Sequence, residues 1–229
     1  MLEKIIRSFS TLAFSAALAF SSPVVPAQEY VPREFEEPVL IEKGRVGQVR
    51  LSFEPENKTT GLAYTFSTRQ DPTRAPPYIY DLKYAERTTE DLDFKINEIF
   101  KGTDDQPFDL SFDSITKTPA IAIRILYPNS IYFFYSNNSE WQSQEVVPMI
   151  SDASSLAFNP KSNLPTIAGH AYGNFDVNLM LSTYDGSKWN TKIISWLDAV
   201  EESLKFNSKG EPCISFTTLG WTNHPSSQY

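Results

Sequence analysis

The chain has 229 residues, with 28 acidic and 20 basic side chains, a net charge of −8 and a pI near 4.9. The acidic balance argues against a nucleic-acid partner, and a single cysteine excludes both an intramolecular disulfide framework and a cysteine-rich zinc site. Hydrophobic residues make up 41% of the chain and aromatic residues 14%, which is enough apolar material for one packed domain.

Residues 1–27 have the layout of a secretory signal peptide. Basic residues open the segment, residues 11–20 are uncharged and rich in Ala, Leu and Phe, and the small residues Val25 and Ala27 precede the cut. The alternative is a transmembrane anchor, but the run is shorter than the roughly 20 apolar residues that span a bilayer. We therefore expect a secreted or periplasmic mature domain of residues 28–229, with no membrane span after cleavage.

A sequence repeat organises the rest of the chain. Each copy contains Leu-x-Phe, a polar turn, a proline and an alternating apolar run, and the weaker first copy lacks the proline. The copies begin at Leu51, Leu110, Leu156 and Leu204. The phenylalanines of the last three copies lie 46 and 48 residues apart. The alternation predicts two short strands joined by a turn in each copy.

A second aromatic position recurs at nearly the same interval, at Phe94, Trp141 and Trp189. The pairs Asn137-Asn138 and Asp185-Gly186 begin four residues before the two tryptophans and tolerate the positive φ that two-residue hairpin turns require. Each unit is therefore expected to form four short antiparallel strands, as in a propeller blade. We predict an all-β fold, a small propeller-like array of about four four-stranded antiparallel blades.

Two segments interrupt the regular pattern. Residues 90–101 have an alternative as a short amphipathic helix, but their register with the tryptophan-containing strands favours a strand. Between Phe66 and Leu82 the first unit is longer than the next one, and it holds three prolines that forbid regular strand pairing. We therefore expect residues 67–81 to form an inserted loop.

The last unit lacks its outer strand, because a further tryptophan-type hairpin would fall beyond Tyr229. The apolar run Val39–Ile41, which precedes a turn at Lys43-Gly44, offers such a strand. We expect this N-terminal strand to complete the C-terminal blade and close a ring, which removes the sheet edges at which proteins aggregate. The alternative is a partial propeller that completes its ring as a homo-oligomer.

The unit SLAFNPKSNLPTIAG…VNLMLSTYDGSKWNTKII resembles the blade of sialidase-like, Asp-box-type β-propeller repeats of secreted bacterial proteins. Asp185, Gly186 and Trp189 match that box, although the segment is one residue short, and the copy before Trp141 lacks both the Asp and the Gly. The resemblance implies a propeller over residues 38–229, in which the box is a turn and packing element. It also implies that an enzyme of this family would carry an arginine cluster and a Tyr/Glu nucleophile pair. No set of arginines in this chain occupies three equivalent places across the repeats.

Polar residues enter the proline-led strand at the fifth position after the proline or its equivalent. These fifth-position residues are Thr65, Arg124, His170 and Thr217. Arg124 and His170 are expected to project from equivalent places on neighbouring blades, where a cation beside an imidazole can bind a carboxylate or a sugar. The alternative is that both are strand-end residues with local partners.

Two other segments supply binding candidates. The inserted loop carries Arg74, Tyr78 and Tyr80, and loops that lengthen one repeat often carry binding. The terminal segment carries Trp221 and His224 with an amide between them, and an aromatic ring beside an amide is common in carbohydrate sites. The alternative for this segment is a terminal loop that packs its tryptophan inward.

No catalytic set is identified. The two histidines are too few for a histidine-rich metal site, and no nucleophile-elbow, zinc-protease or phosphate-binding motif occurs. Cys213 occupies a small-residue position that favours a buried structural thiol. We expect a ligand-binding or interaction module for carbohydrate or another small anionic or polar ligand, without cofactor or metal. The alternative is a glycoside-active, sialidase-like hydrolase whose catalytic residues are dispersed over several blades.

Overall fold

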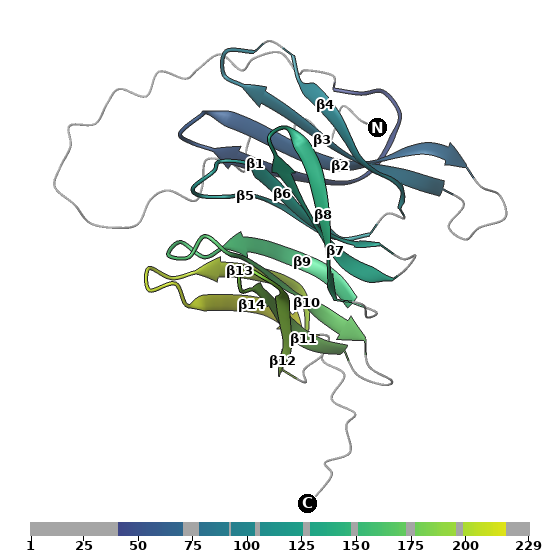
Figure 1. Cartoon of the computed structure of the whole chain (residues 1–229). Helices are drawn as coiled ribbons and strands as arrows, with labels where there is room; N and C mark the ends of the chain where they lie inside the picture. The colour runs from purple at the N-terminus through teal and green to yellow at the C-terminus, as the bar shows by residue number, and fades with distance from the viewer. Residues whose placement is uncertain are drawn as a thin grey trace, which may run out of the picture. The chain divides into compact units, whose positions relative to one another are not determined.

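The computed structural model describes residues 41–70, 78–91, 93–103, 106–125, 129–147, 151–172, 177–195 and 199–218. The chain divides into two compact units, residues 1–42 and 43–229, and all the described strands lie in the second unit. The described residues form fourteen β-strands and no α-helix, which confirms the expected all-β class (Figure 1). In the same part of the chain, no helix has the length and apolarity that a membrane crossing requires.

The strands form four antiparallel sheets, each built from strands that are consecutive in the sequence. The first sheet contains β1 (Arg45–Glu54), β2 (Thr59–Gln70), β3 (Tyr78–Thr88) and β4 (Lys95–Thr103). The second contains β5 (Phe108–Phe112), β6 (Pro119–Ile125), β7 (Ser130–Asn137) and β8 (Glu140–Val147). The third contains β9 (Ser151–Phe158), β10 (Pro165–Tyr172), β11 (Val177–Tyr184) and β12 (Trp189–Ser195), and the fourth contains β13 (Ala199–Phe206) and β14 (Pro212–Thr218). Three sheets have the predicted four strands, the fourth has two within the described residues, and none of them is closed.

The sheet register confirms the alignment of the sequence repeat. The phenylalanine of each Leu-x-Phe lies opposite the residue at or next to the start of the following strand. These pairs are Phe53–Thr60, Phe112–Pro119, Phe158–Pro165 and Phe206–Pro212. Proline is tolerated at the first residue of a strand, so it marks where the second strand begins without breaking the ladder. The repeated local sequence therefore folds into the same two-stranded unit at the start of every sheet.

A capped turn joins the first two strands of every sheet, and the sequence analysis did not anticipate it. The residue after each phenylalanine accepts backbone hydrogen bonds with its side chain, which closes the turn. These capping residues are Glu54, Asp113, Asn159 and Asn207. Near the end of each turn one residue has a positive φ, namely Lys58, Lys117, Asn163 or Gly210. An acid or amide directly after Leu-x-Phe in all four copies is the sequence signal for this turn.

The outer hairpins follow the prediction in part. Residues 95–103 form β4, so the strand interpretation is confirmed and the helix alternative is wrong. Between β7 and β8 the turn is Asn138-Ser139, with positive φ at both residues and one position later than predicted. Between β11 and β12, Tyr184 pairs with Trp189, so the predicted two-residue turn is wrong and the loop has four residues. Asp185 accounts for the longer loop, because its carboxylate accepts two backbone hydrogen bonds within it.

The insertion in the first unit lengthens a hairpin. β2 continues to Gln70, β3 begins at Tyr78, and these two residues pair with each other. The expectation of an unpaired loop over residues 67–81 is therefore wrong at both of its ends. The three prolines fall in residues 71–77, outside the described residues, so that no proline occupies a paired position of this hairpin.

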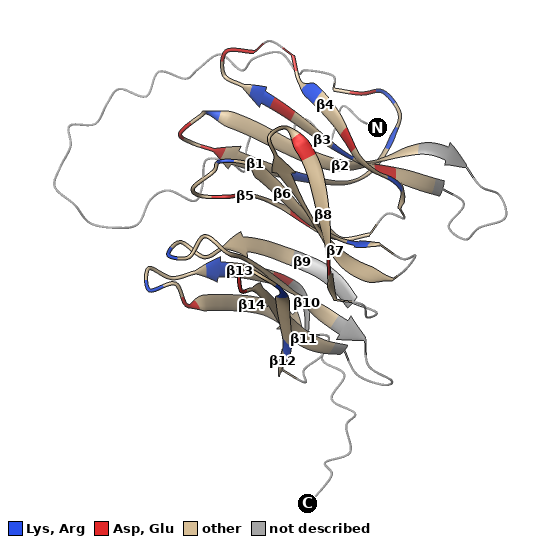
Figure 2. Cartoon of the chain, in the orientation of Figure 1, with Lys and Arg blue, Asp and Glu red and all other residues tan. Residues whose placement is uncertain are grey.

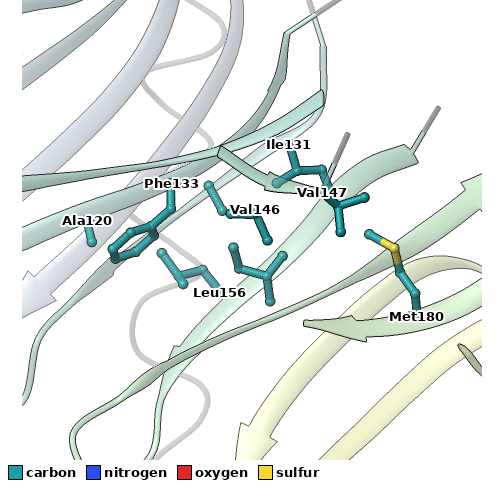
Figure 3. Close-up of a cluster of buried hydrophobic side chains, with 9 residues drawn as sticks. Ala120, Ile131, Phe133, Val146, Val147, Leu156 and Met180 are labelled. Atoms are coloured by element: carbon teal, nitrogen blue, oxygen red, sulfur yellow. The ribbon is translucent and has the colours of Figure 1, made fainter. Parts of the chain in front are cut away.

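Neighbouring sheets pack through the leucine of the repeat. Leu110 lies in a cluster with residues of the first sheet, Leu156 in one with residues of the second and Leu204 in one with residues of the third. Figure 3 shows the cluster around Leu156, where side chains from the second and third sheets converge: Ala120, Ile131, Phe133, Val146, Val147 and Met180. The first strands also contact one another in order, β1 with β5, β5 with β9 and β9 with β13. Each sheet after the first thus packs its leucine on its predecessor.

Two expectations concern the ends of this series of sheets. Residues 39 and 40 lie outside the described residues and Ile41 is not in a strand, so the closing N-terminal strand stays a prediction. Cys213 on β14 is exposed, so the expected burial of its thiol is wrong. The equivalent small residues of the first three sheets, Gly61, Ala120 and Thr166, are buried, whereas the fourth sheet is the last one within the described residues.

Candidate functional site

Arg124 and His170 stand near the ends of the second strands of neighbouring sheets. The register places Arg124 one residue before the end of β6 and His170 two residues before the end of β10. The connections to the next strands, residues 126–128 and 173–176, lie outside the described residues. Because both residues lie near the C-terminal end of the second strand, they occupy equivalent positions at the same end of their sheets.

A partner within its own sheet fixes Arg124, which is partly buried. Its Nε and Nη2 both donate hydrogen bonds to Asn129 Oδ1, at 3.2 and 3.1 Å. Asn129 has a φ of 70° and immediately precedes β7. These two hydrogen bonds hold the guanidinium in one orientation at the end of the strand. It is a positioned cation with planar donor geometry.

The partner of His170 comes from the neighbouring sheet. His170 is 8% exposed and Glu202 of β13 is 5% exposed, and His170 Nδ1 lies 3.3 Å from Glu202 Oε1. A neutral imidazole donates through Nδ1 at this contact, and a protonated one forms an ion pair there. An imidazole whose tautomer is set by a carboxylate can serve as a general acid or base. The same pair also ties the third sheet to the fourth.

The other fifth-position residues differ from these two. Thr65 is buried, and its Oγ1 accepts a hydrogen bond from the Gln48 backbone N–H at 2.9 Å. Thr217 is exposed on β14. The four sheets thus share the position but not its environment, and a joint site of Arg124 and His170 stays a prediction.

The remaining candidates divide between the core and the segments outside the described residues. Tyr80 is buried and lies within β3, where it pairs with Ser67 of β2 and with Thr103 of β4, so it is part of the sheet and not of a loop. Tyr78 opens β3, but its side chain is outside the described residues. Arg74, Trp221 and His224 lie outside them entirely, so their binding roles stay predictions.

A polar network that the sequence analysis missed links the first strands of three sheets. Asp109 Oδ2 of β5 accepts hydrogen bonds from Leu156 N at 2.7 Å and from Ser155 Oγ at 3.3 Å. Ser155 Oγ in turn accepts one from the Leu204 backbone N–H of β13 at 3.0 Å. The sequence signal is a polar residue three positions before each repeat phenylalanine: Arg50, Asp109, Ser155 and Ser203.

Opposing effects act on the Asp109 carboxyl. Partial burial raises its pKa above the usual value. Hydrogen bonds from the backbone N–H groups of Leu156 and Leu110, and the charges of Arg50 and Lys205, oppose that rise without cancelling it. The Asp109 carboxylate accepts hydrogen bonds both from its own strand and from the third sheet, so the group is placed to hold the two sheets together.

The turn that resembles an Asp-box combines loop closure with packing. Hydrogen bonds hold the pKa of the exposed Asp185 carboxyl well below its usual range, first the one from Lys188 N–H and then the one from the Ser187 hydroxyl. The Trp189 ring, which follows the turn, lies edge-on to Phe133 of the second sheet with ring centroids 5.3 Å apart. These contacts close the loop and attach the third sheet to the second.

Within the described residues, no group of three or more His, Cys, Asp or Glu side chains is arranged to hold a metal ion. Acidic and basic residues are interspersed over the described strands and turns (Figure 2). Comparison with protein-family models and with curated proteins finds no match to this chain. Function therefore has to be inferred from the placement of the side chains themselves.

Proposed function

We propose that the chain is a secreted or periplasmic interaction module with a propeller-like, sialidase-like fold that binds carbohydrate or another small anionic or polar ligand. Four antiparallel sheets whose first strands contact one another in order support the propeller-like arrangement. The signal-peptide pattern of residues 1–27 supports export. The observation that carries the ligand proposal is the equivalent placement of Arg124 and His170 on adjacent sheets.

The chemistry of Arg124 and His170 at this end of the sheets suits a carboxylate or a polyol. A guanidinium with a fixed orientation pairs with a carboxylate or donates to sugar hydroxyls, and an imidazole adds a donor or an acceptor. In the sequence, the other candidates also follow the second strand of a sheet. These residues are Arg74 and Tyr78 after β2, and Trp221 and His224 after β14.

A glycan array and a thermal-shift screen with small carboxylates test this proposal. We expect at least one ligand to raise the melting temperature of the unmodified chain and to lose affinity in Arg124→Ala. Arg87→Ala is the matched control. Arg87 lies near the end of β3, at the end of the first sheet opposite to that of Arg124, and its guanidinium stacks on Phe94. Absence of any hit, or a hit that Arg124→Ala and His170→Ala leave unchanged, would count against the site.

A hydrolase is the second candidate, and the His170–Glu202 pair is the observation that favours it. The two groups come from different sheets and lie within reach of proton transfer, which fits catalytic residues dispersed over several blades. Turnover of fluorogenic glycosides tests this candidate. We expect His170→Gln to abolish any turnover and Glu202→Gln to shift the pH profile of the rate, with both variants folded by circular dichroism. Turnover that survives both substitutions would reject the pair as the acid–base group.

A further inference from the structure

The repeat leucine and phenylalanine of the first sheet are exposed, unlike the leucines at the same position in the other sheets. Leu51 is 53% exposed and Phe53 is 56% exposed. Leu110, Leu156 and Leu204 are buried against the preceding sheet. The first sheet has no preceding sheet within the described residues, so β1 presents two large apolar side chains that elsewhere in the repeat pack on a sheet.

The surface that receives this contact also recurs. Small residues of the second strand face the next sheet, and a Cβ added at Gly61 would lie 2.8 Å from the Phe112 ring. Ala120, the equivalent of Gly61 in the second sheet, belongs to the cluster against which Phe158 packs. The equivalent residue of the fourth sheet is Cys213, which is exposed. The fourth sheet therefore carries an uncovered copy of the receiving surface.

Contacts between the capped turns also recur from sheet to sheet. Lys117 Nζ, in the turn of the second sheet, lies 2.7 Å from Glu56 Oε1 in the turn of the first. Asn163, at the same place in the third sheet, donates a hydrogen bond to the turn of the second. The equivalent residue of the first sheet is Lys58, which is exposed. The corresponding residues of the fourth turn, between Asn207 and Gly210, are Ser208 and Lys209, so no acidic residue stands at the place of Glu56 there.

We propose that a second copy of this chain covers the exposed face of β1, so that the first sheet of each copy packs on the fourth sheet of the other. Leu51 and Phe53 then lie over Cys213, and Lys58 lies near the capping residue Asn207, as their equivalents do inside one chain. This inference rests on the proposed propeller-like arrangement. The contact joins two different surfaces, so it either closes into a ring or continues as a filament. The described residues of two copies supply eight sheets, within the range of about four to eight blades in closed propellers, and we expect the association to end at a dimer.

Thiol cross-linking in the full chain tests the contact directly. Phe53→Cys places a second thiol opposite Cys213, which is the only native cysteine. We expect a short bis-maleimide to give a covalent species of two chain masses, with residues 53 and 213 linked in peptide mass spectra. Ile115→Cys is the matched control, because Ile115 is an exposed apolar residue in a turn of the second sheet, and it should stay unlinked. Cys213→Ser in the Phe53→Cys chain should also abolish linkage.

Each alternative occupant gives a different result. A linked species with the mass of one chain would show that the fourth sheet of the same chain covers β1, and would overturn the second copy. A ladder longer than two chains would overturn closure as a dimer. Light scattering provides an independent measurement, in which we expect two chain masses for the unmodified chain and one for Leu51→Glu. One chain mass at all concentrations would refute the contact. None of these measurements involves a ligand, so failure of the ligand proposal leaves them unaffected.

Discussion

Replacement of Leu156 by alanine measures the packing between the second and third sheets. Its side chain is buried in the cluster of Figure 3, between Phe133 and Met180 among others. Removal of three carbon atoms costs about 2.4 kcal/mol of transfer free energy, at about 0.8 kcal/mol for each methylene. The cavity left between two sheets adds to that loss, since neither sheet can collapse into it without moving a whole ladder. We expect the free energy of unfolding to fall by about 3 kcal/mol, within the roughly 2–5 kcal/mol seen for such changes.

Leu51→Ala is the matched control, because it changes the same residue type at the same repeat position. Leu51 is about half exposed, so its replacement loses about half of the transfer free energy and leaves no buried cavity. We therefore expect the free energy of unfolding to fall by about 1 kcal/mol. Urea unfolding followed by tryptophan fluorescence measures both losses, since Trp141 and Trp189 report contacts between sheets. The protein is diluted until its mass is that of one chain. Equal losses at the two positions, or a loss below about 1 kcal/mol at Leu156, would refute the packing argument.

Three further predictions concern stability. Gly61→Ala should lower it by about 1–3 kcal/mol in urea unfolding, because the new methyl group would meet the Phe112 ring, and an unchanged midpoint would contradict this. The raised pKa of Asp109 makes the folded chain hold its proton to higher pH than the unfolded chain, so stability falls as pH rises through that acidic window. Asp109→Asn should remove this fall, and urea midpoints of the two proteins that run parallel across the window would disprove it. Gly210→Ala should cost more than Gly186→Ala by thermal unfolding, because both glycines have a positive φ but only Gly210 has a neighbour within reach of a new Cβ; equal costs would argue against that crowding.

The parts of the fold that depend on neighbours in the chain were predictable from the sequence. Leu-x-Phe, a polar turn and a proline located the first two strands of the later sheets, because alternation and turn chemistry act over a few residues. The loop at Asp185 was mispredicted because side-chain hydrogen bonds set its length, whereas the prediction used only the φ preference of Asp-Gly. The β2–β3 hairpin was mispredicted because its three prolines fall in the sequence between the last paired residues, Gln70 and Tyr78, and none of them is itself in a paired strand.

Contacts between sheets were not predictable in the same way. Asp109 and Ser155 are 46 residues apart in the sequence, and His170 and Glu202 are 32 apart. Alternation shows which residues share a face of a strand, but it does not show which residue of the neighbouring sheet lies opposite. Cys213 illustrates the same limit, because its exposure depends on whether another sheet follows and not on its own residue type.

The apolar contacts between the sheets do not determine which sheet follows which. Every sheet after the first packs the same leucine on its predecessor, so an exchange of neighbours would preserve that packing. The polar contacts differ at each interface. Loss of the partner of a buried polar group costs about 1–3 kcal/mol, whereas an exposed ion pair such as Lys117–Glu56 contributes about 1 kcal/mol or less. They are Lys117–Glu56 between the first and second sheets, Asp109–Leu156 and Asn163–Asp113 between the second and third, and His170–Glu202 and Asn159–Gly210 between the third and fourth. Apolar packing therefore holds the sheets together while the polar set fixes their order.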